Sequence, residues 1–245
     1  QVSFVGAVGS DAYAEPAMHY LQASGVNLEN VARTEEVTGL AVITVDEQGE
    51  NTIIVVPGAN ALVDAPFVAS HSSPITESEL VLLQGEIPAD GFAKAVELVK
   101  GRVVVNLAPV IEVNKDALLR ANPLLANEHE AGLILEQLGL SGEGAPAELA
   151  QRLREAGFAS VVLTLGASGA LVAEGTSLVT VPSPQVTAVD TTGAGDAFAG
   201  ALCARLLLGD DLVEAATYAA RVGAFAVTGA GAQASYPDRD TELPS

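Results

Sequence analysis

The chain has 245 residues, of which 49% are hydrophobic, and this is enough to bury the core of one α/β domain. Its 31 acidic and 11 basic residues give a formal net charge of −20, which argues against nucleic acid or an anionic membrane as a partner. The single cysteine, Cys203, excludes an intramolecular disulfide, and no signal peptide or apolar spanning segment is evident. We therefore expect a cytoplasmic protein.

Strand and helix patterns alternate from the first residues onward. Residues 2–5 predict a strand, and residues 14–24 predict a helix that ends at Gly25. Residues 40–45 and 52–56 alternate like two strands of a hairpin around a turn-rich segment. Three strand-then-helix units follow, with strands at 80–83, 103–105 and 124–126 and helices at 91–99, 115–120 and 128–138.

The second half of the chain continues the alternation. It has a strand at 160–165, a glycine turn, strands around Leu171 and Val179, a strand-like stretch at 186–189, and helices at 197–208 and 212–227. Such an order predicts an α/β fold with a mostly parallel central sheet flanked by helices on both faces. Ligands of such sheets bind at the carboxyl ends of the strands.

The run Asp190 to Phe198, with the sequence DTTGAGDAF, combines a glycine turn with a carboxylate at the mouth of an apolar helix. Gly193 and Gly195 allow tight dihedral angles, so that successive N–H groups can face one concavity and attract an oxyanion. A carboxylate beside such a cradle would repel phosphate, but Asp196 could accept the proton of an attacking hydroxyl group. The alternative is that Asp196 only caps the helix.

This run resembles the signature of the ribokinase-like sugar kinase family. Further stretches resemble the family in the same order along the chain, at residues 37–45, 49–60, 84–86, 106–109, 127–130, 164–169 and 231–235. The resemblance implies an ATP-dependent kinase that phosphorylates the 5-hydroxyl group of D-ribose and uses Mg²⁺ and K⁺. A related kinase for a nucleoside, fructose or a sugar acid, and a non-catalytic sugar or nucleotide sensor, remain alternatives.

The resemblance also implies roles for individual residues around the reaction centre. Asp196 would bind the sugar and act as the catalytic base, while the N–H groups of Gly193, Ala194 and Gly195 would form an anion hole. Glu86 would hydrogen-bond the sugar, because a carboxylate accepts from more than one hydroxyl group. The alternative for Glu86 is a solvated charge at a strand end.

The nucleotide would be held by residues from several segments. Asn127 and Glu130 would organise the phosphates and hydrated Mg²⁺, although their spacing is also that of a capping box, and both roles can coexist. The resemblance implies that Gly195 and Ala220 also contact the nucleotide. It further implies a nucleotide-binding loop at Thr164, Leu165, Gly166, Ala167, Ser168 and Gly169. As alternatives, the loop is an ordinary turn and Ala220 is a buried core alanine.

A monovalent cation site is implied close to the signature. Hard oxygen donors suit K⁺, and the implied donors are Asp190, Thr192, Ala226, Gly229, Gly231 and Ser235. Residues 229–234 also match the pattern G-x-G-x-x-A, but too little chain follows to build the βαβ unit of a dinucleotide site.

The resemblance also bears on the start of the chain and on a lid. In the family, an opening strand with sugar-binding Asn and Asp, and a Gly-Gly segment, precede the region that resembles residues 2–9. We therefore expect residues 1–245 to be a single kinase domain that is incomplete at its N-terminus. Residues 38–57 would contribute a small β lid, through which two chains would form a homodimer. Apart from the second chain of the homodimer, the partners that the resemblance implies are ATP and a small sugar substrate.

Overall fold

The computed structural model describes residues 1–45 and 51–245, which divide into two compact units. The first unit comprises residues 1–77 and 85–98, and the second comprises residues 78–84 and 99–245. Within these described ranges, no helix has both the length and the apolar character that crossing a bilayer requires. The expected α/β class, with a mostly parallel sheet and a small β hairpin, is confirmed.

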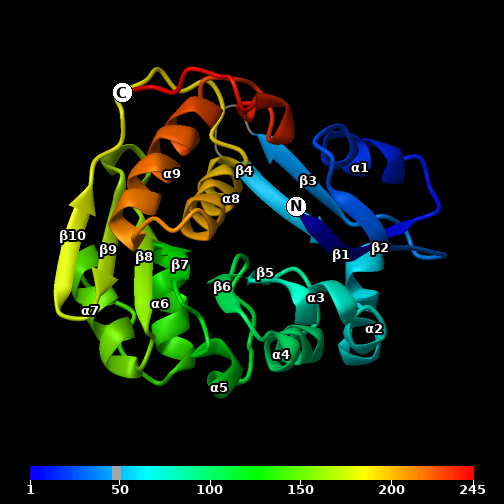
Figure 1. Cartoon of the computed structure of the whole chain (residues 1–245), viewed down its shortest axis with the longest axis horizontal. Coiled ribbons are helices and arrows are strands. Elements are labelled where there is room, and N and C mark those ends of the chain that lie inside the picture. The colour runs from blue at the N-terminus through cyan, green and yellow to red at the C-terminus, as the bar shows by residue number, and fades with distance from the viewer. Residues whose placement is uncertain (46–50) are drawn as a thin grey trace. The chain divides into compact units, whose positions relative to one another are not determined.

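The first unit contains a two-stranded parallel sheet. Strand β1 (Ser3–Gly9) pairs with β2 (Asn27–Thr34), and helix α1 (Ala14–Ala23) connects them, as Figure 1 shows in blue. Burial of Val8, Ala14 and Met18 against Leu28 and Val31 attaches the helix to the sheet. The sequence predicted β1 and α1, whereas β2 was missed.

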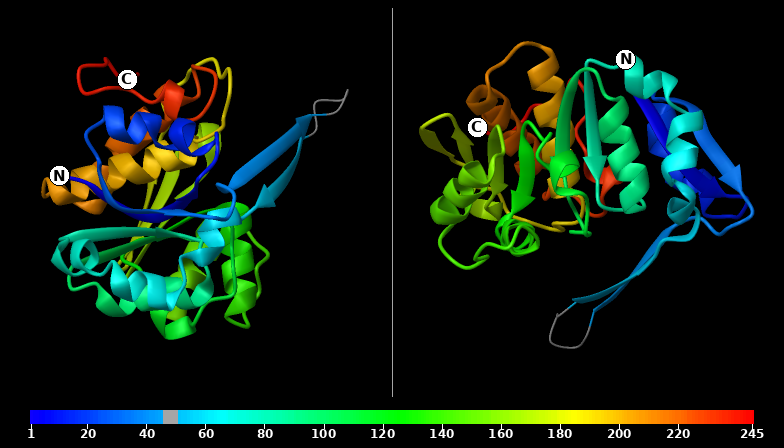
Figure 2. Two further views of the ribbon diagram at one scale, coloured as in Figure 1. Left: turned by 90° about the vertical axis from the view of Figure 1, so that its right-hand side faces the viewer. Right: turned by 90° about the horizontal axis from the view of Figure 1, so that it is seen from below.

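The predicted hairpin forms in the first unit. Strand β3 (Leu40–Val45) pairs antiparallel with β4 (Asn51–Val56), and Leu40 lies opposite Val56. Figure 2 shows this hairpin extending away from β1 and β2 of the same unit. The pairing of the strands is confirmed, while the turn predicted at 46–50 lies outside the described residues.

Short helices complete the first unit. The 3₁₀ segment η1 (Gly58–Leu62) and helices α2 (Ala65–Ser70) and α3 (Ser73–Glu77) precede α4 (Ala89–Leu98), which packs against α2 and α3. The side chain of Asp64 caps α2 by accepting a hydrogen bond from the backbone N–H of Phe67. The sequence predicted α4 but missed α2 and α3.

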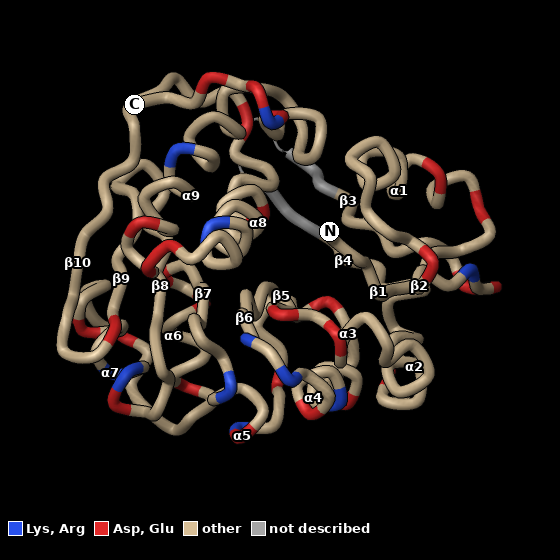
Figure 3. Tube along the Cα trace, viewed as in Figure 1, with Lys and Arg blue, Asp and Glu red and all other residues tan. Residues whose placement is uncertain are grey.

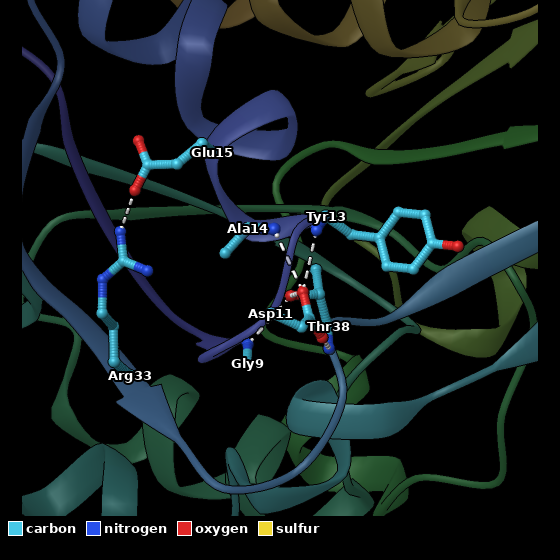
Figure 4. Close-up of polar contacts among 7 residues, drawn as sticks. All are labelled: Gly9, Asp11, Tyr13, Ala14, Glu15, Arg33 and Thr38. Atoms are coloured by element: carbon cyan, nitrogen blue, oxygen red, sulfur yellow. Dashed lines mark hydrogen bonds and ion pairs between the residues drawn. The ribbon is translucent and has the colours of Figure 1, made fainter.

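A hydrogen-bond network around Asp11 ties the turn after β1 to the base of the hairpin (Figure 4). Asp11 Oδ1 accepts from the backbone N–H groups of Tyr13 and Ala14, at 2.9 and 3.2 Å. Thr38 donates its N–H to Asp11 Oδ2 at 2.7 Å and its hydroxyl to Oδ1 at 2.8 Å, and the Thr38 hydroxyl accepts from Gly9 N–H at 3.0 Å. These bonds, led by that of Thr38 N–H, lower the pKa of Asp11.

The second unit is built on a six-stranded sheet. In spatial order its strands are β10 (Ser177–Val181), β9 (Ala170–Glu174), β8 (Ser160–Thr164), β7 (Leu124–Asn127), β6 (Arg102–Asn106) and β5 (Leu80–Gln84). Strands β5 to β8 are parallel, and β9 and β10 add an antiparallel edge. Charged residues fall mainly outside the central strands of this sheet (Figure 3).

Helices cover both faces of this sheet. Successive residues of a strand point to opposite faces, and both Val161 and Val162 of β8 are fully buried. Val162 packs in one cluster with Leu202 of α8 (Ala194–Leu207) and Ala216 of α9 (Leu212–Ala226). Helices α6 (Glu128–Gln137) and α7 (Pro146–Ala156) also contact β8, and the short α5 (Lys115–Leu118) lies between β6 and β7 in the chain.

Two further features of the second unit are the buried cysteine of α8 and the irregular segment after β10. Cys203 is buried in α8, and burial raises the pKa of its thiol to about 12. The strand expected at residues 186–189 is wrong, because the chain has no regular secondary structure there. Pro182 and Pro184 lack the N–H donors that a ladder beyond β10 would need, and Val189 N–H instead bonds to the carbonyl oxygen of Val227.

Candidate active site

The N-terminus of α8 forms one wall of the candidate site. Gly193, the residue before the helix, has a left-handed φ of 76° and offers no side-chain cap. A Cβ added at Gly193 would lie 2.5 Å from the hydroxyl oxygen of Tyr236, whereas a Cβ added at Gly195 would meet nothing within 4 Å. Gly193 is therefore required by packing, while Gly195 presents open backbone at the positive end of the helix dipole.

Asp196 lies in the first turn of α8 and borders a cavity of about 200 Å³. The side-chain amide of Gln84, at the end of β5, donates to Asp196 Oδ1 at 2.9 Å. The cavity is lined by Asn106, Ala108, Leu125, Asn127, Glu130, Thr164, Gly193, Gly195 and Asp196. The structure thus brings the predicted base, two anion-hole residues and the predicted Mg²⁺-organising pair to one hollow.

Two carboxyl groups at this cavity have perturbed acidity. Burial raises the pKa of Asp196, and the hydrogen bond from Gln84 opposes this shift. Burial also raises the pKa of Glu130, the N–H of Asn127 and the charge of His129 oppose it, and the charge of Asp196 adds to it. A raised pKa makes a carboxylate a stronger base, provided that it remains ionised at the working pH.

Asn127 and Glu130 form the capping box that their spacing allowed. Glu130 N–H donates to Asn127 Oδ1, and Asn127 N–H donates to Glu130 Oε2, both at 2.8 Å. This structural role at the start of α6 is confirmed. Both residues also line the smaller cavity, so the proposed role toward hydrated Mg²⁺ stays a prediction.

A larger cavity of about 400 Å³ adjoins the same helix end and shares Asn127, Thr164 and Gly195 with the smaller one. Of the predicted nucleotide positions, its lining includes Asn127, Thr164, Gly166, Ala167, Gly169, Gly195 and Ala220. Leu165 and Ser168 are not part of this lining, and Leu165 N–H instead bonds to the carbonyl oxygen of Gly169 at 2.8 Å.

Much of the remaining wall of this cavity was not predicted from the sequence. Besides Thr191, Ala194 and Phe198 of the signature, the cavity is lined by Ser183, Pro184, Gln185, Val186, Ala188, Gly223, Ala224 and Val227. Most of these side chains are small or apolar, so they suit a flat ring system and leave little chemical signal in a sequence. Only the spacing of Gly223 and Ala224 relative to Ala220, on one face of α9, could have pointed to them.

Four of the residues predicted to bind a monovalent cation lie in two segments, one before α8 and one after α9, which a hydrogen bond joins. Asp190 Oδ1 accepts from Thr192 N–H at 2.9 Å, and Oδ2 accepts from Gly231 N–H at 2.8 Å. Hydrogen bonds from the side chain and backbone of Thr192, and then from Gly231, lower the pKa of Asp190. The hydroxyl of Ser235 donates to the carbonyl oxygen of Gly231 at 2.8 Å.

The other two predicted cation positions lie at the end of α9 and just after it. Ala226 is the last residue of α9, and a Cβ added at Gly229 would lie 3.0 Å from Cβ of Ser235. Across the described residues, no group of three or more His, Cys, Asp or Glu side chains could hold a metal ion. A cation here would thus depend on backbone carbonyl oxygens and one carboxylate, a donor set that fits K⁺.

Glu86, the predicted sugar ligand, belongs to the first unit. It is exposed in the bend between β5 and α4. Its role toward a sugar stays a prediction.

Comparisons with known proteins agree with this geometry. The pattern of the pfkB family carbohydrate kinases matches residues 1–239. The ribokinase of Schizosaccharomyces pombe is 36% identical over 97% of this chain and 77% of its own length. The crystal structure of the Thermotoga maritima ribokinase has a TM-score of 0.87 at 31% identity, covering 97% of this chain and 78% of that one.

The structure of a plant ribokinase has the same TM-score to this chain as the Thermotoga maritima structure. The Arabidopsis thaliana ribokinase, solved with ribose and ATP, has a TM-score of 0.87 at 27% identity, covering 97% of this chain and 79% of that one. The family pattern matches almost the entire chain, and the relatives align with 97% of it. The chain belongs to the pfkB family of carbohydrate kinases.

Proposed function

We propose that this chain transfers the γ-phosphoryl group of ATP to the 5-hydroxyl group of D-ribose. The observation that carries the proposal is the position of Asp196, a carboxylate of raised pKa in the first turn of α8, beside the open backbone of Gly195. The names of the relatives support ribose as the sugar, because the chain aligns with ribokinases from a fungus, a bacterium and a plant.

Asp196 acts as the base in this proposal. The bond from Gln84 occupies Oδ1, which leaves Oδ2 to accept the proton of the attacking hydroxyl group. The N–H groups of Gly193, Ala194 and Gly195 then stabilise the charge on the transferring phosphoryl group, assisted by the dipole of the 14-residue helix α8. Glu86 holds the sugar through its hydroxyl groups.

The larger cavity accepts the nucleotide. Its volume of about 400 Å³ lies within the usual range of small-molecule sites, and Ala220 and Gly223 leave room for the adenine ring. Asn127 and Glu130 hold hydrated Mg²⁺, which supplies positive charge to the phosphates. The two hydrogen-bonded segments around Asp190 and Gly231 bind K⁺, which supplies positive potential next to the anion hole.

The β3–β4 hairpin serves as the lid and as the contact of a homodimer. Val42, Ile54 and Val55 of this hairpin are 47%, 56% and 54% exposed, and a second hairpin of the same kind would cover these apolar side chains. We place the protein in the cytoplasm, where ATP and free sugar are available.

The test compares wild-type protein with Asp196→Asn in a coupled assay of sugar-dependent ADP release. We expect turnover to fall about 10²-fold or more, because the amide cannot accept the proton, while ATP affinity changes little. Asp116→Asn, an exposed position in the first turn of α5, is the matched control and should keep wild-type turnover.

A panel of acceptors tests the sugar. D-ribose should give the highest kcat/KM among ribose, fructose, a nucleoside and a sugar acid. A higher value for another acceptor would reassign the substrate within the family, and no ADP release with any acceptor would favour a sensor.

A further inference from the structure

A tyrosine near the C-terminus contacts the candidate anion hole from behind. The hydroxyl of Tyr236 donates to the carbonyl oxygen of Gly193 at 3.0 Å, across 43 residues of chain. The same carbonyl oxygen accepts the N–H of Ala197 at 2.9 Å, as part of helix α8. Burial, and then the charge of Asp196, raise the pKa of the Tyr236 hydroxyl to about 12, so that it is a protonated donor at neutral pH.

The contact is closely packed. The ring of Tyr236 packs against a buried cluster of Ala197, Val222 and Ala226. A Cβ added at Gly193 would lie 2.5 Å from the tyrosine hydroxyl oxygen. Tyr236 is therefore fixed in place, and the Gly193 carbonyl oxygen is fixed with it.

Two donors on one carbonyl oxygen change the peptide group to which it belongs. The Gly193 carbonyl shares its peptide unit with the N–H of Ala194, which is one of the proposed anion-hole donors. Hydrogen bonds that a carbonyl accepts polarise the peptide, and this makes its N–H a stronger donor. The bond also restricts rotation of the peptide plane. The Ala194 N–H donates only a long hydrogen bond, 3.3 Å, to the carbonyl oxygen of Thr191, and a phosphate oxygen would replace this acceptor without a rotation of the peptide.

We propose that Tyr236 is a positioning residue of the anion hole, which orients and polarises the Gly193–Ala194 peptide through its hydroxyl group. The inference rests on the proposed function, since it concerns the donors that would stabilise the transferring phosphoryl group. Tyr236 acts on the backbone of the signature loop and does not itself touch the reacting atoms.

The experiment removes only the hydroxyl group, with the variant Tyr236→Phe. Tyr218→Phe is the matched control, because Tyr218 packs against the same apolar cluster but its ring lies under Arg205, at 5.0 Å from the guanidinium carbon. We expect Tyr236→Phe to lower kcat about 5-fold, a fraction of the effect of deleting an oxyanion-hole donor outright, with the KM for sugar unchanged. Tyr218→Phe should keep the wild-type kcat.

A second readout separates positioning from general packing. The complex of MgADP with aluminium fluoride mimics the transferring phosphoryl group, and its affinity should fall by the same factor as kcat, whereas the affinity for MgADP alone should not change. An unchanged kcat and an unchanged affinity for the fluoride complex would overturn the inference, as would equal losses in both tyrosine variants.

A third readout does not need enzymatic activity. The amide proton of Ala194 should shift upfield in the NMR spectrum of Tyr236→Phe, because its peptide has lost one hydrogen-bond donor. If the wild-type protein phosphorylated no acceptor, the proposed function would fail, and this shift would still test whether Tyr236 polarises the peptide. An unmoved Ala194 signal in a folded variant would refute the contact itself.

Discussion

Two glycines of the signature should respond in opposite ways to the same substitution. Gly193 has a φ of 76°, and a Cβ there would meet Tyr236 and Ala232 at 2.5 and 2.8 Å. Gly195 has no neighbour within 4 Å of an added Cβ and lies in the first turn of α8, where alanine is favoured over glycine. Gly193→Ala should therefore damage the fold, whereas Gly195→Ala should damage only the proposed phosphate site.

The magnitudes follow from these contacts. Placing alanine in the left-handed region costs about 1–2 kcal/mol. Relieving the two close contacts of the Gly193→Ala methyl costs about 1–3 kcal/mol more, as in an overpacked core. The sum of about 2–5 kcal/mol corresponds to a fall in Tm of about 4–20 °C for a protein of this size. Gly195→Ala should leave Tm unchanged or raise it slightly, since alanine is worth up to about 1 kcal/mol over glycine in a helix.

Differential scanning calorimetry and the coupled kinase assay measure the two effects separately. Gly195→Ala should lower kcat by about tenfold or more, because its methyl group occupies space that phosphoryl oxygens need beside the anion hole. Wild-type turnover in Gly195→Ala would refute the reasoning, because no phosphate could then approach this backbone closely. A Tm of Gly193→Ala equal to that of wild type would show that the left-handed turn adapts to a side chain.

Two further predictions concern carboxylates. Gln84→Leu removes the bond that opposes the raised pKa of Asp196, so the acidic limb of the kcat/KM profile should move to higher pH, and an unmoved limb would exclude Gln84 as a partner of the base. Because the pKa of Asp11 is lowered, its carboxylate stabilises the fold above the unfolded-state pKa of about 4, and this stabilisation is lost as pH falls through the folded-state value. The Tm difference between wild type and Asp11→Asn should therefore be largest at neutral pH and shrink in acid, and a constant difference in circular-dichroism melts would argue against the Thr38 network.

Local patterns predicted most of the fold, and the misses have identifiable causes. Strand β2 was missed because the sequence of Asn27–Thr34 does not alternate and its residues are only partly buried or exposed. Helix α7 was not predicted, although its sequence has the start and stop signals of a helix. Pro146 lies in its first turn, and Gly157 follows its end with a φ of 118°. The strand at 186–189 was predicted from its β-branched residues, and this prediction is wrong because it left out of account the prolines that precede it.

The candidate site also has a part that local sequence predicts and a part that it does not. The glycine turn and Asp196 are contiguous in sequence, so their chemistry can be recognised without a structure. Gln84 contacts Asp196 from 112 residues upstream, and Tyr236 contacts Gly193 from 43 residues downstream. No local sequence pattern indicates such contacts. Residues of this kind become visible only when the sheet and its helices assemble.

The buried thiol of Cys203 has a practical consequence. It is the only cysteine of the chain, and with a pKa of about 12 it forms almost no thiolate at neutral pH. A cysteine introduced at an exposed position such as Val42 on the hairpin would then be the single reactive thiol. The natural sequence is thus ready for selective attachment of a fluorophore or spin label, without prior removal of other cysteines, to follow the hairpin as nucleotide and sugar are added.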